Sequence, residues 1–315
     1  MRTRLIRTLP GIDCVRAMHR WWTYLQERFP PLENGLLVAV FGLSALYHSA
    51  LLRGGPELPG VQPAGAAFGL TLLFFFLLRV ADEFKDLEKD RRYRPERPVP
   101  RGLISLTELG AAGVAAGIVQ LALAVWIDAT LILVLLGAWA YFGLMGVEFF
   151  VPDWLDRRPV LYMLSHMVIM PAIALLAAGC DWAAAAATPP AGLAWFLGAS
   201  FFGGLVFEIG RKIRAPEGER TGVETYSKVW GRTRAVVAWL GVLLLAGGAA
   251  VGAAEQVGVT TIAAGILGAA LLGAVVVAGR FLRAPSPDRA EAIEVMSGAW
   301  LLVLYGSVGL LPLVW

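Results

Sequence analysis

The sequence is poor in the charged residues that cover the surface of a soluble protein. Only 16% of its 315 residues are Asp, Glu, Lys or Arg, whereas 57% are hydrophobic and the mean hydropathy is +0.66. A soluble domain of this size needs more polar surface than this composition supplies. The chain is therefore expected to be a membrane protein with several spans.

Cysteine is also scarce, and no cationic surface of the kind that binds nucleic acid is evident. Cys14 and Cys180 are expected on opposite sides of the membrane, which excludes a disulfide between them. The net charge of +3 comes from residues dispersed among membrane loops, so nucleic acid is not an expected partner. The first 33 residues contain several arginines and no long apolar run, so no cleavable signal peptide is expected.

The rest of the chain is divided into apolar stretches, each near the roughly 20 residues that cross a bilayer core. Nine transmembrane helices are expected at about 34–52, 64–83, 105–126, 129–150, 160–180, 192–212, 233–253, 259–281 and 293–314. The length and continuity of these runs exclude the short alternating strands of a membrane barrel. The predicted fold class is all-α and polytopic. An N-terminal segment at 1–33 with an interfacial helix over 12–29 precedes a nine-helix domain at 34–315.

The distribution of basic residues predicts the orientation of these helices. All 27 Lys and Arg residues except Arg53 and Arg79 fall in segments that the nine-span arrangement places on one side. Positive loops face the cytoplasm, so we expect a cytoplasmic N-terminus and, in a bacterium, a place in the inner membrane. The two richest loops, which follow the second and sixth spans, should then lie on the same face.

The first of these loops belongs to residues 79–102, which we call the first charged segment. In it, Asp82, Asp86 and Asp90 are spaced by four residues, so a helix would carry all three on one face. Like charges at this spacing repel one another and favour a cation between them. Carboxylate oxygens at this density suit Mg²⁺, which binds one or two carboxylates together with a substrate's phosphate oxygens.

Guanidinium groups follow the carboxylates in the same segment and can grip phosphate through paired hydrogen bonds. They belong to Arg91, Arg92, Arg94, Arg97 and Arg101. Together with the carboxylates they predict a diphosphate site. The alternative is a solvated cytoplasmic turn in which Asp and Arg neutralise one another.

The first charged segment resembles a motif of the UbiA superfamily of intramembrane prenyltransferases. The three aspartates, followed by the stretch RPERPVPRG at 94–102, are similar to that family's first aspartate-rich motif and its basic tail. The family usually begins this motif with Asn, whereas this chain has Ala81 and Asp82 there. The resemblance implies a nine-helix fold, a prenyl diphosphate donor, a lipophilic acceptor and Mg²⁺.

A second charged segment, residues 208–231, lies where the family carries its second aspartate-rich motif. Gly222 to Thr225 read GVET and match the end of that motif. Glu208 stands near the place of the leading aspartate, but Lys212, rather than an acid, follows four residues later. The resemblance implies that Glu208, and less directly Glu217 and Glu219, bind metal. It also implies diphosphate contacts from Arg211, Lys212 and Arg214 and from the basic pair Arg157 and Arg158. The alternative is a helix end and a solvated turn.

The resemblance implies that Asp82, Asp86, Asp90 and Glu208 act in catalysis. Mg²⁺ and the cationic side chains would stabilise the diphosphate as the allylic C–O bond breaks, and an acceptor would capture the prenyl group where water is excluded. Within the spans, Glu148 is expected near this site and His48 near the outer interface. His166 could line the same cavity, but a hydrogen-bonded structural role is the favoured interpretation. Nothing in the sequence selects the acceptor or the oligomeric state.

Other functions remain open. A divergent member of the family could bind a lipid diphosphate without transferring it, or could cyclise the prenyl chain. A transporter would place its ionisable groups near the midplane rather than at one face. The aspartate spacing does not fit the membrane CDP-alcohol phosphotransferases.

Overall fold

The computed structural model describes residues 10–54 and 57–315, with side chains from residue 17 onward. Over this part of the chain it is helical and has no strand, which confirms the predicted fold class. The first nine residues of the predicted N-terminal segment lie outside the described residues. Helix α1, Pro10–Arg28, follows them and matches the interfacial helix expected over 12–29.

Nine helices of the described chain are long and apolar enough to cross a membrane. They are α2 Pro31–Arg53, α3 Val61–Lys85, α5 Leu106–Ile127, α6 Ala129–Gly146, the pair α8 Pro159–Met167 and α9 Ile169–Ala184, α10 Leu193–Gly210, α12 Arg232–Gln256, α13 Thr260–Arg283, and α14 Pro287–Tyr305 with its continuation to Leu313. This number of spans and their apolar composition make the chain an integral, multi-pass membrane protein.

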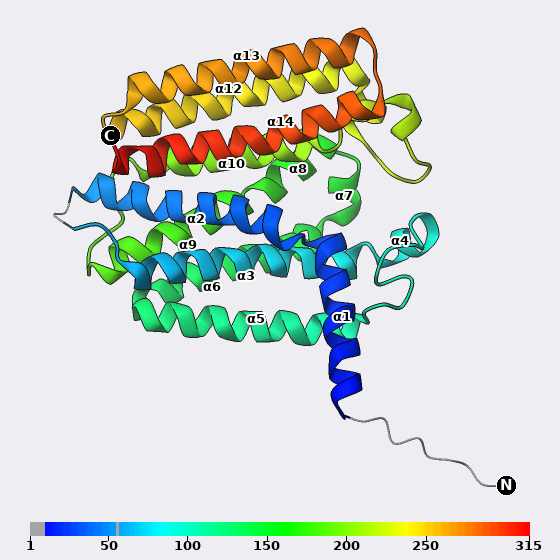
Figure 1. Ribbon diagram of the computed structural model, residues 1–315, viewed down its shortest axis with the longest axis horizontal. Helices are drawn as coiled ribbons and strands as arrows, with labels where there is room; N and C mark the ends of the chain where they lie inside the picture. The colour runs from blue at the N-terminus through cyan, green and yellow to red at the C-terminus, as the bar shows by residue number, and fades with distance from the viewer. Residues whose placement is uncertain (1–9, 55–56) are drawn as a thin grey trace.

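Short elements connect the spans at one end of the bundle. They are α4 Leu87–Tyr93, the 3₁₀ turn η1 Glu148–Phe150, α7 Pro152–Asp156, the 3₁₀ turn η2 Pro216–Gly218 and α11 Tyr226–Trp230. Figure 1 shows α4, α7 and the connection from α10 to α12 at the same end, with α1 crossing that end at a steep angle to the spans. The two charged segments therefore share one end of the molecule, as the charge distribution predicted.

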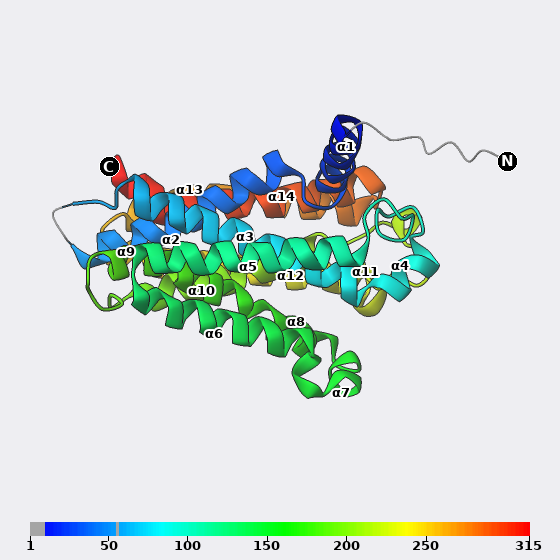
Figure 2. The same cartoon turned by 90° about the horizontal axis from the view of Figure 1, so that it is seen from below.

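The spans pack in two groups that meet along α2, α9 and α10. Helices α3, α5, α6 and α9 contact one another on one side, while α10, α12, α13 and α14 do so on the other. Figure 2 shows the spans as near-parallel rods seen from below. Small residues allow this close packing: Gly309 lies against the backbone of Ser44, and Gly210 lies against Ser297 and Trp239.

The fourth span is shorter than predicted. We expected it to continue to residue 150, but α6 ends at Gly146. Glu148, Phe149 and Phe150 have φ values of 50°, 53° and 61°, a left-handed conformation that non-glycine residues rarely adopt. Three such residues in a row follow the end of the helix, between Gly146 and Pro152, which were the available sequence signals for its end.

The end of the bundle opposite the charged segments holds buried polar groups. Arg53 Nη2 lies 2.7 Å from Asp181 Oδ1, and Ser49 Oγ donates to Asp181 Oδ2 at 2.8 Å, which joins α2 to α9. His48 was expected at the interface, but it is fully buried, and its Nδ1 lies 2.9 Å from the carbonyl oxygen of Val308. That carbonyl belongs to η3, the π-helical turn Gly306–Leu310 that continues α14.

Gly309→Ala is expected to destabilise the protein. A Cβ at this position would come within 2.4 Å of Ser44 Cα, so helix α2 would have to shift. Overpacking of this kind costs about 1–3 kcal/mol, which should lower the thermal unfolding midpoint in detergent. Gly306→Ala is the matched control, because nothing lies within 4 Å of its added Cβ. Equal midpoints for both variants would contradict the close approach of η3 to α2.

Candidate functional site

The first charged segment begins on the last turn of α3. Helix α3 ends at Lys85, and Asp86 joins it to α4 with near-helical angles, φ −88° and ψ 0°. The amide of Asp86 donates to the carbonyl of Asp82, and that of Asp90 to the carbonyl of Asp86, both at 2.8 Å. The i,i+4 register predicted for the three aspartates is therefore kept in the backbone across the junction.

The three aspartates nevertheless have different surroundings. Asp82 has a side chain 53% exposed, and it meets Arg79 at 3.3 Å. Asp86 is half-buried and forms no ion pair with any described side chain. Asp90 is buried, and its carboxylate accepts from Arg97 at 2.6 Å and from Arg94 at 3.3 Å. Two of the three aspartate carboxylates are thus free or weakly paired, while the third is occupied.

The basic tail of the segment has a surplus of positive charge around Asp90. Burial lowers the pKa of Arg94, and the nearby guanidinium of Arg97 lowers it further. One carboxylate shared by two guanidinium groups leaves about one positive charge uncompensated, a situation that favours an incoming anion.

The last arginine of the tail, Arg101, is engaged elsewhere. It forms an ion pair with Glu27 of α1 at 2.7 Å and donates to the carbonyl of Glu96 at 2.7 Å. In α1, Arg28 also pairs with Glu83, and Arg20 pairs with Glu108 at 3.0 Å. Sequence analysis missed these contacts, because their partners lie far along the chain. The sequence offered one signal for these contacts: side chains of opposite charge stand on α1 and at the two ends of the connection between α3 and α5.

A small apolar core completes the attachment of α1. Tyr24 is fully buried against Val80, Ile104 and Leu109. Burial, followed by the charge of Glu83, raises the pKa of Tyr24 above its ordinary value, so its phenol stays protonated. Helix α1 thereby fixes the end of α3 that carries Asp82.

Two acids of the second charged segment, Glu208 and Glu219, have partners within the segment itself. Glu208, at the end of α10, is buried and forms ion pairs with Arg211 and with Lys212, the latter at 2.7 Å. Glu219 accepts from Thr225 Oγ1 at 2.6 Å and so closes the loop before α11. Glu217 is exposed. Arg214 pairs with Glu294 of α14 at 3.0 Å. Glu208 and Glu219 are therefore occupied, whereas Glu217 has no partner among the described side chains.

The two charged segments touch each other. Arg220 lies 3.2 Å from Glu96, although both side chains are largely exposed. Gly222, with φ +75°, packs against the ring of Tyr93 so closely that a Cβ there would come within 2.4 Å of the ring. The match of GVET to the family motif thus falls on a residue that must be glycine both for its backbone angle and for this contact.

The basic pair at 157–158 lies apart, in the turn between α7 and α8. Arg158 stacks over Trp154 at 4.3 Å and donates to the Trp154 carbonyl at 3.0 Å. Figure 2 shows α7 displaced from α4, although both are at the same end. The role of Arg157 and Arg158 in diphosphate binding stays a prediction.

The carboxylates of the first charged segment fit Mg²⁺, although they do not form a complete metal site. Among the described side chains, no three His, Cys, Asp or Glu residues converge as a complete metal site. Mg²⁺ does not require such a group, because it keeps several waters and takes one or two carboxylates plus phosphate oxygens. Asp82 and Asp86, four residues apart on adjoining turns and without a strong partner, provide that minimum.

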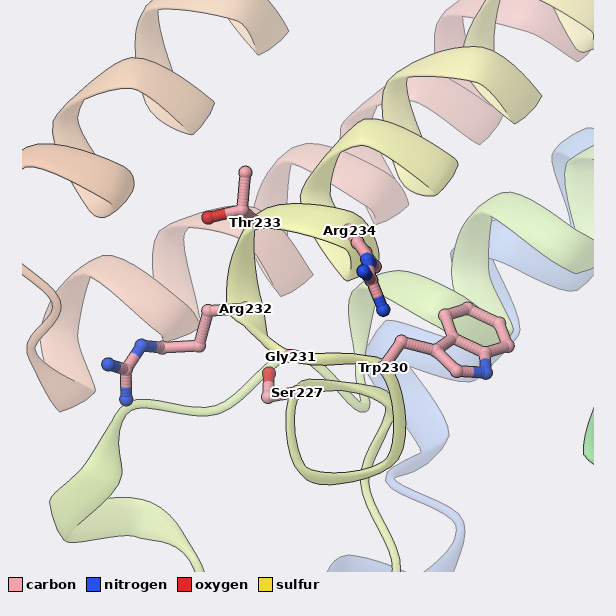
Figure 3. A pocket seen from close by; sticks show the side chains of 6 residues that line it. All are labelled: Ser227, Trp230, Gly231, Arg232, Thr233 and Arg234. Carbon is pink, nitrogen blue, oxygen red and sulfur yellow. The ribbon is translucent and has the colours of Figure 1, made fainter.

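A shallow depression of about 440 Å³ lies near the second charged segment, where α11 meets α12. Figure 3 shows its six lining residues, with Arg232 and Arg234 extending in different directions around Gly231. None of the six is a predicted site residue and none is acidic, so the depression is distinct from the site of Asp82, Asp86 and Asp90.

Comparisons with known proteins agree with this architecture. The sequence model of the UbiA prenyltransferase family matches residues 42–301. No curated protein matches the chain. The fold is similar to that of a digeranylgeranylglyceryl phosphate synthase, with TM-score 0.61 and 14% identity over 93% of this chain and 99% of the other.

Two archaeal structures show the same likeness. A UbiA homologue from Aeropyrum pernix K1, solved in the apo form, has TM-score 0.62 and 17% identity over 84% of this chain and 97% of its own. A UbiA homologue from Archaeoglobus fulgidus, bound to GPP and Mg²⁺, has TM-score 0.52 and 15% identity over 88% and 99%. At these identities the likeness shows the fold.

Gly222→Ala is expected to separate the two charged segments. The added methyl group would strike the Tyr93 ring and also strain the left-handed backbone. The loss of this contact should speed amide hydrogen exchange in residues 88–97 and 216–230 by about 10-fold, which corresponds to roughly 1.4 kcal/mol of local stability. Gly218→Ala serves as the control, because its Cβ would meet only Arg214 at 3.9 Å. Unchanged exchange in Gly222→Ala would show that the segments do not depend on each other.

Proposed function

Because the chain belongs to the UbiA prenyltransferase family, we propose that it is an intramembrane prenyltransferase that moves a prenyl group from an isoprenoid diphosphate to a lipophilic acceptor. The observation that carries the proposal is the pair Asp82 and Asp86, two carboxylates without a strong partner beside guanidinium groups in surplus. The UbiA homologue bound to GPP and Mg²⁺ supports the donor class and the metal, since it has the same fold.

In this proposal Asp82 and Asp86 hold Mg²⁺ together with oxygens of the donor diphosphate. The ion would neutralise the diphosphate and so stabilise it as a leaving group. Arg94 and Arg97 bind the same diphosphate, and Asp90 orients their guanidinium groups. Metal binding by Asp90 itself stays a prediction, and it requires both arginines to turn from Asp90 to the substrate.

The second charged segment supplies further cations in this proposal. Arg211 and Lys212 share Glu208, so two positive charges face one negative charge there as well. When diphosphate binds, these cations can turn to it and release Glu208 to the metal. Glu217 and Glu219 stay weaker predicted ligands, since Glu219 already accepts from Thr225. Arg214, Arg101 and the pair at 157–158 are proposed to add positive potential rather than direct contacts.

One alternative has a specific observation in its favour. The pairing of Glu208 with Arg211 and Lys212 leaves the leading acid of the second motif occupied, as in a divergent member that binds a lipid diphosphate without transfer. Binding of prenyl diphosphate without release of inorganic diphosphate, over a broad panel of acceptors, would favour this alternative.

Asp82→Asn and Asp86→Asn are expected to weaken Mg²⁺-dependent binding of geranyl diphosphate by about 100-fold or more. Each substitution removes a negatively charged ligand of the metal that would bind the diphosphate. Glu208→Gln should reduce turnover. Equilibrium binding and diphosphate release by the purified protein in nanodiscs measure both effects. Asp153→Asn, an exposed acid at the same end, is the control. Donor binding that survives Asp86→Asn would refute the site.

The dependence on Mg²⁺ concentration separates a ligand from an orienting residue. In Asp86→Asn the half-saturating Mg²⁺ concentration should rise by about 10-fold or more, as for the loss of a ligand. In Asp90→Asn it should stay within about 3-fold of wild type while donor affinity falls, because the arginines lose their orientation. A large rise in both variants would instead make Asp90 a metal ligand.

We further propose that the end bearing both charged segments faces the cytoplasm, because nearly all Lys and Arg residues lie there. Glu217→Cys, with Cys14 replaced by Ser, tests this orientation. A membrane-impermeant maleimide should label the variant in inverted vesicles and leave it unlabelled in intact cells. The reverse pattern would place the site on the outer face.

A further inference from the structure

A second polar cluster lies beside the aspartates, on the side of α3 that faces α8 and η1. Its members are Lys85, Glu148, Tyr162 and His166, which we call the α3–α8 polar cluster. Lys85 forms an ion pair with Glu148 and donates a hydrogen bond to the Tyr162 hydroxyl. That hydroxyl in turn donates to Glu148 Oε1 at 3.1 Å. The rings of Tyr162 and His166 stack at 3.9 Å with an angle of 12° between their planes.

The backbone that presents Glu148 is strained. Glu148 and the two residues after it all have positive φ, which costs about 1–2 kcal/mol for each non-glycine residue. Apolar packing accounts for part of this strain, because Phe149 lies edge-on to the rings of Tyr141 and His166, whereas Phe150 is 75% exposed. The strained turn does place the Glu148 carboxylate against Lys85, Tyr162 and His166. Strain of this kind persists where the surrounding structure holds a functional group in position.

The hydrogen bonds of His166 indicate which of its two ring nitrogens carries no proton. Its Nδ1 lies 2.8 Å from the carbonyl oxygen of Tyr162, which can only accept a hydrogen bond. The hydrogen-bond network thus assigns the proton of the neutral imidazole to Nδ1, and Nε2 carries a lone pair. Nε2 faces Glu148 Oε2 at 3.3 Å. Both atoms are buried, and neither has a hydrogen-bond partner among the described residues.

Two acceptor atoms that face each other in a buried place repel, and a proton between them turns this repulsion into a hydrogen bond. The Glu148–His166 pair therefore gains an interaction when it takes up a proton or meets a hydroxyl donor. Lys85 lies between Asp82 and Asp86 in the chain and contacts both Glu148 and Tyr162. The pair is thus one side chain away from the proposed diphosphate site.

We propose that the α3–α8 polar cluster is the acceptor subsite and takes an uncharged hydroxyl, of an alcohol or a phenol, which donates its hydrogen bond to His166 Nε2 next to Glu148 Oε2. This inference rests on the proposed prenyltransferase function. The opposite charges of Lys85 and Glu148 cancel, so the cluster favours a neutral acceptor over a carboxylate. His166 and Glu148 are its catalytic residues, whereas Lys85 and Tyr162 are positioning residues.

The transfer step balances with these groups. The bond between prenyl C1 and the bridging oxygen of the diphosphate breaks, and its electron pair leaves with the diphosphate. A lone pair of the acceptor oxygen forms the new C–O bond to C1. The O–H bond of the acceptor breaks, and its proton goes to His166 Nε2, where it is hydrogen-bonded to Glu148 Oε2. No oxidation or reduction is involved.

The test compares 4-propylphenol with 4-propylanisole, which has the same shape but no O–H group. Their binding to the full-length protein in nanodiscs is measured by calorimetry, without donor and without Mg²⁺. Wild type should bind the phenol at least about 10-fold more tightly, and Glu148→Gln and His166→Phe should each remove most of this preference. His166→Phe preserves an aromatic stack on Tyr162 and leaves the Lys85 ion pair in place. Glu255→Gln is the matched control and should keep the preference, because Glu255 lies at the C-terminal end of α12, at the end of the bundle away from the cluster (Figure 1).

The same preparations are titrated with geranyl diphosphate and Mg²⁺, which keeps the two proposals apart. Donor affinity within about 3-fold of wild type in both variants, together with the lost phenol preference, supports the acceptor subsite. Equal affinity of wild type for the phenol and the anisole, or a preference that survives both substitutions, overturns it even when the donor binds normally. Failure of the donor to bind wild type would instead overturn the proposed function.

Discussion

A buried charge in this protein requires an opposite charge beside it, and this constraint determines where free charge is found. The buried acids are Glu83, Asp90, Asp181 and Glu208, and each pairs with arginine or lysine in the described structure. An unpaired carboxylate in so apolar a bundle would cost several kcal/mol. The weakly paired Asp82 and the unpaired Asp86 therefore lie at the end of α3, where water, a metal ion and a substrate can reach them.

Part of this arrangement could be predicted from the sequence. The nine spans follow from the length of the apolar runs, and the common end of the two charged segments follows from the positions of Lys and Arg. The pairing of Glu208 was also predictable, because Arg211 and Lys212 stand three and four residues later on the same helical face. The resemblance to an acidic motif directed attention to Glu208 as a ligand and away from this simpler pairing.

Other parts could not be predicted, because they depend on tertiary contacts. Glu27 meets Arg101, and Lys85 meets Glu148, across long stretches of chain. The left-handed turn at 148–150 contains no glycine, and its conformation depends on the tertiary contacts of Glu148 and Phe149. The predicted boundary between 1–33 and 34–315 stays a prediction. Two ion pairs from α1 nevertheless tie that helix to the first charged segment, and a third joins it to Glu108 of α5.

The two polar regions at the end of α3 differ in the kind of charge they offer, and this difference suits two different substrates. Around Asp90 and Glu208, cations outnumber the acids they pair with, which favours a polyanionic diphosphate. In the α3–α8 polar cluster, Lys85 and Glu148 cancel, and the unsatisfied atoms are acceptors of a proton. Lys85 lies between the two aspartates in the chain, so one turn of helix faces both regions. A diphosphate that leaves as an anion and an acceptor that loses a proton would then be bound next to each other along this turn of α3. The side chain of Lys85 would lie between the two binding regions.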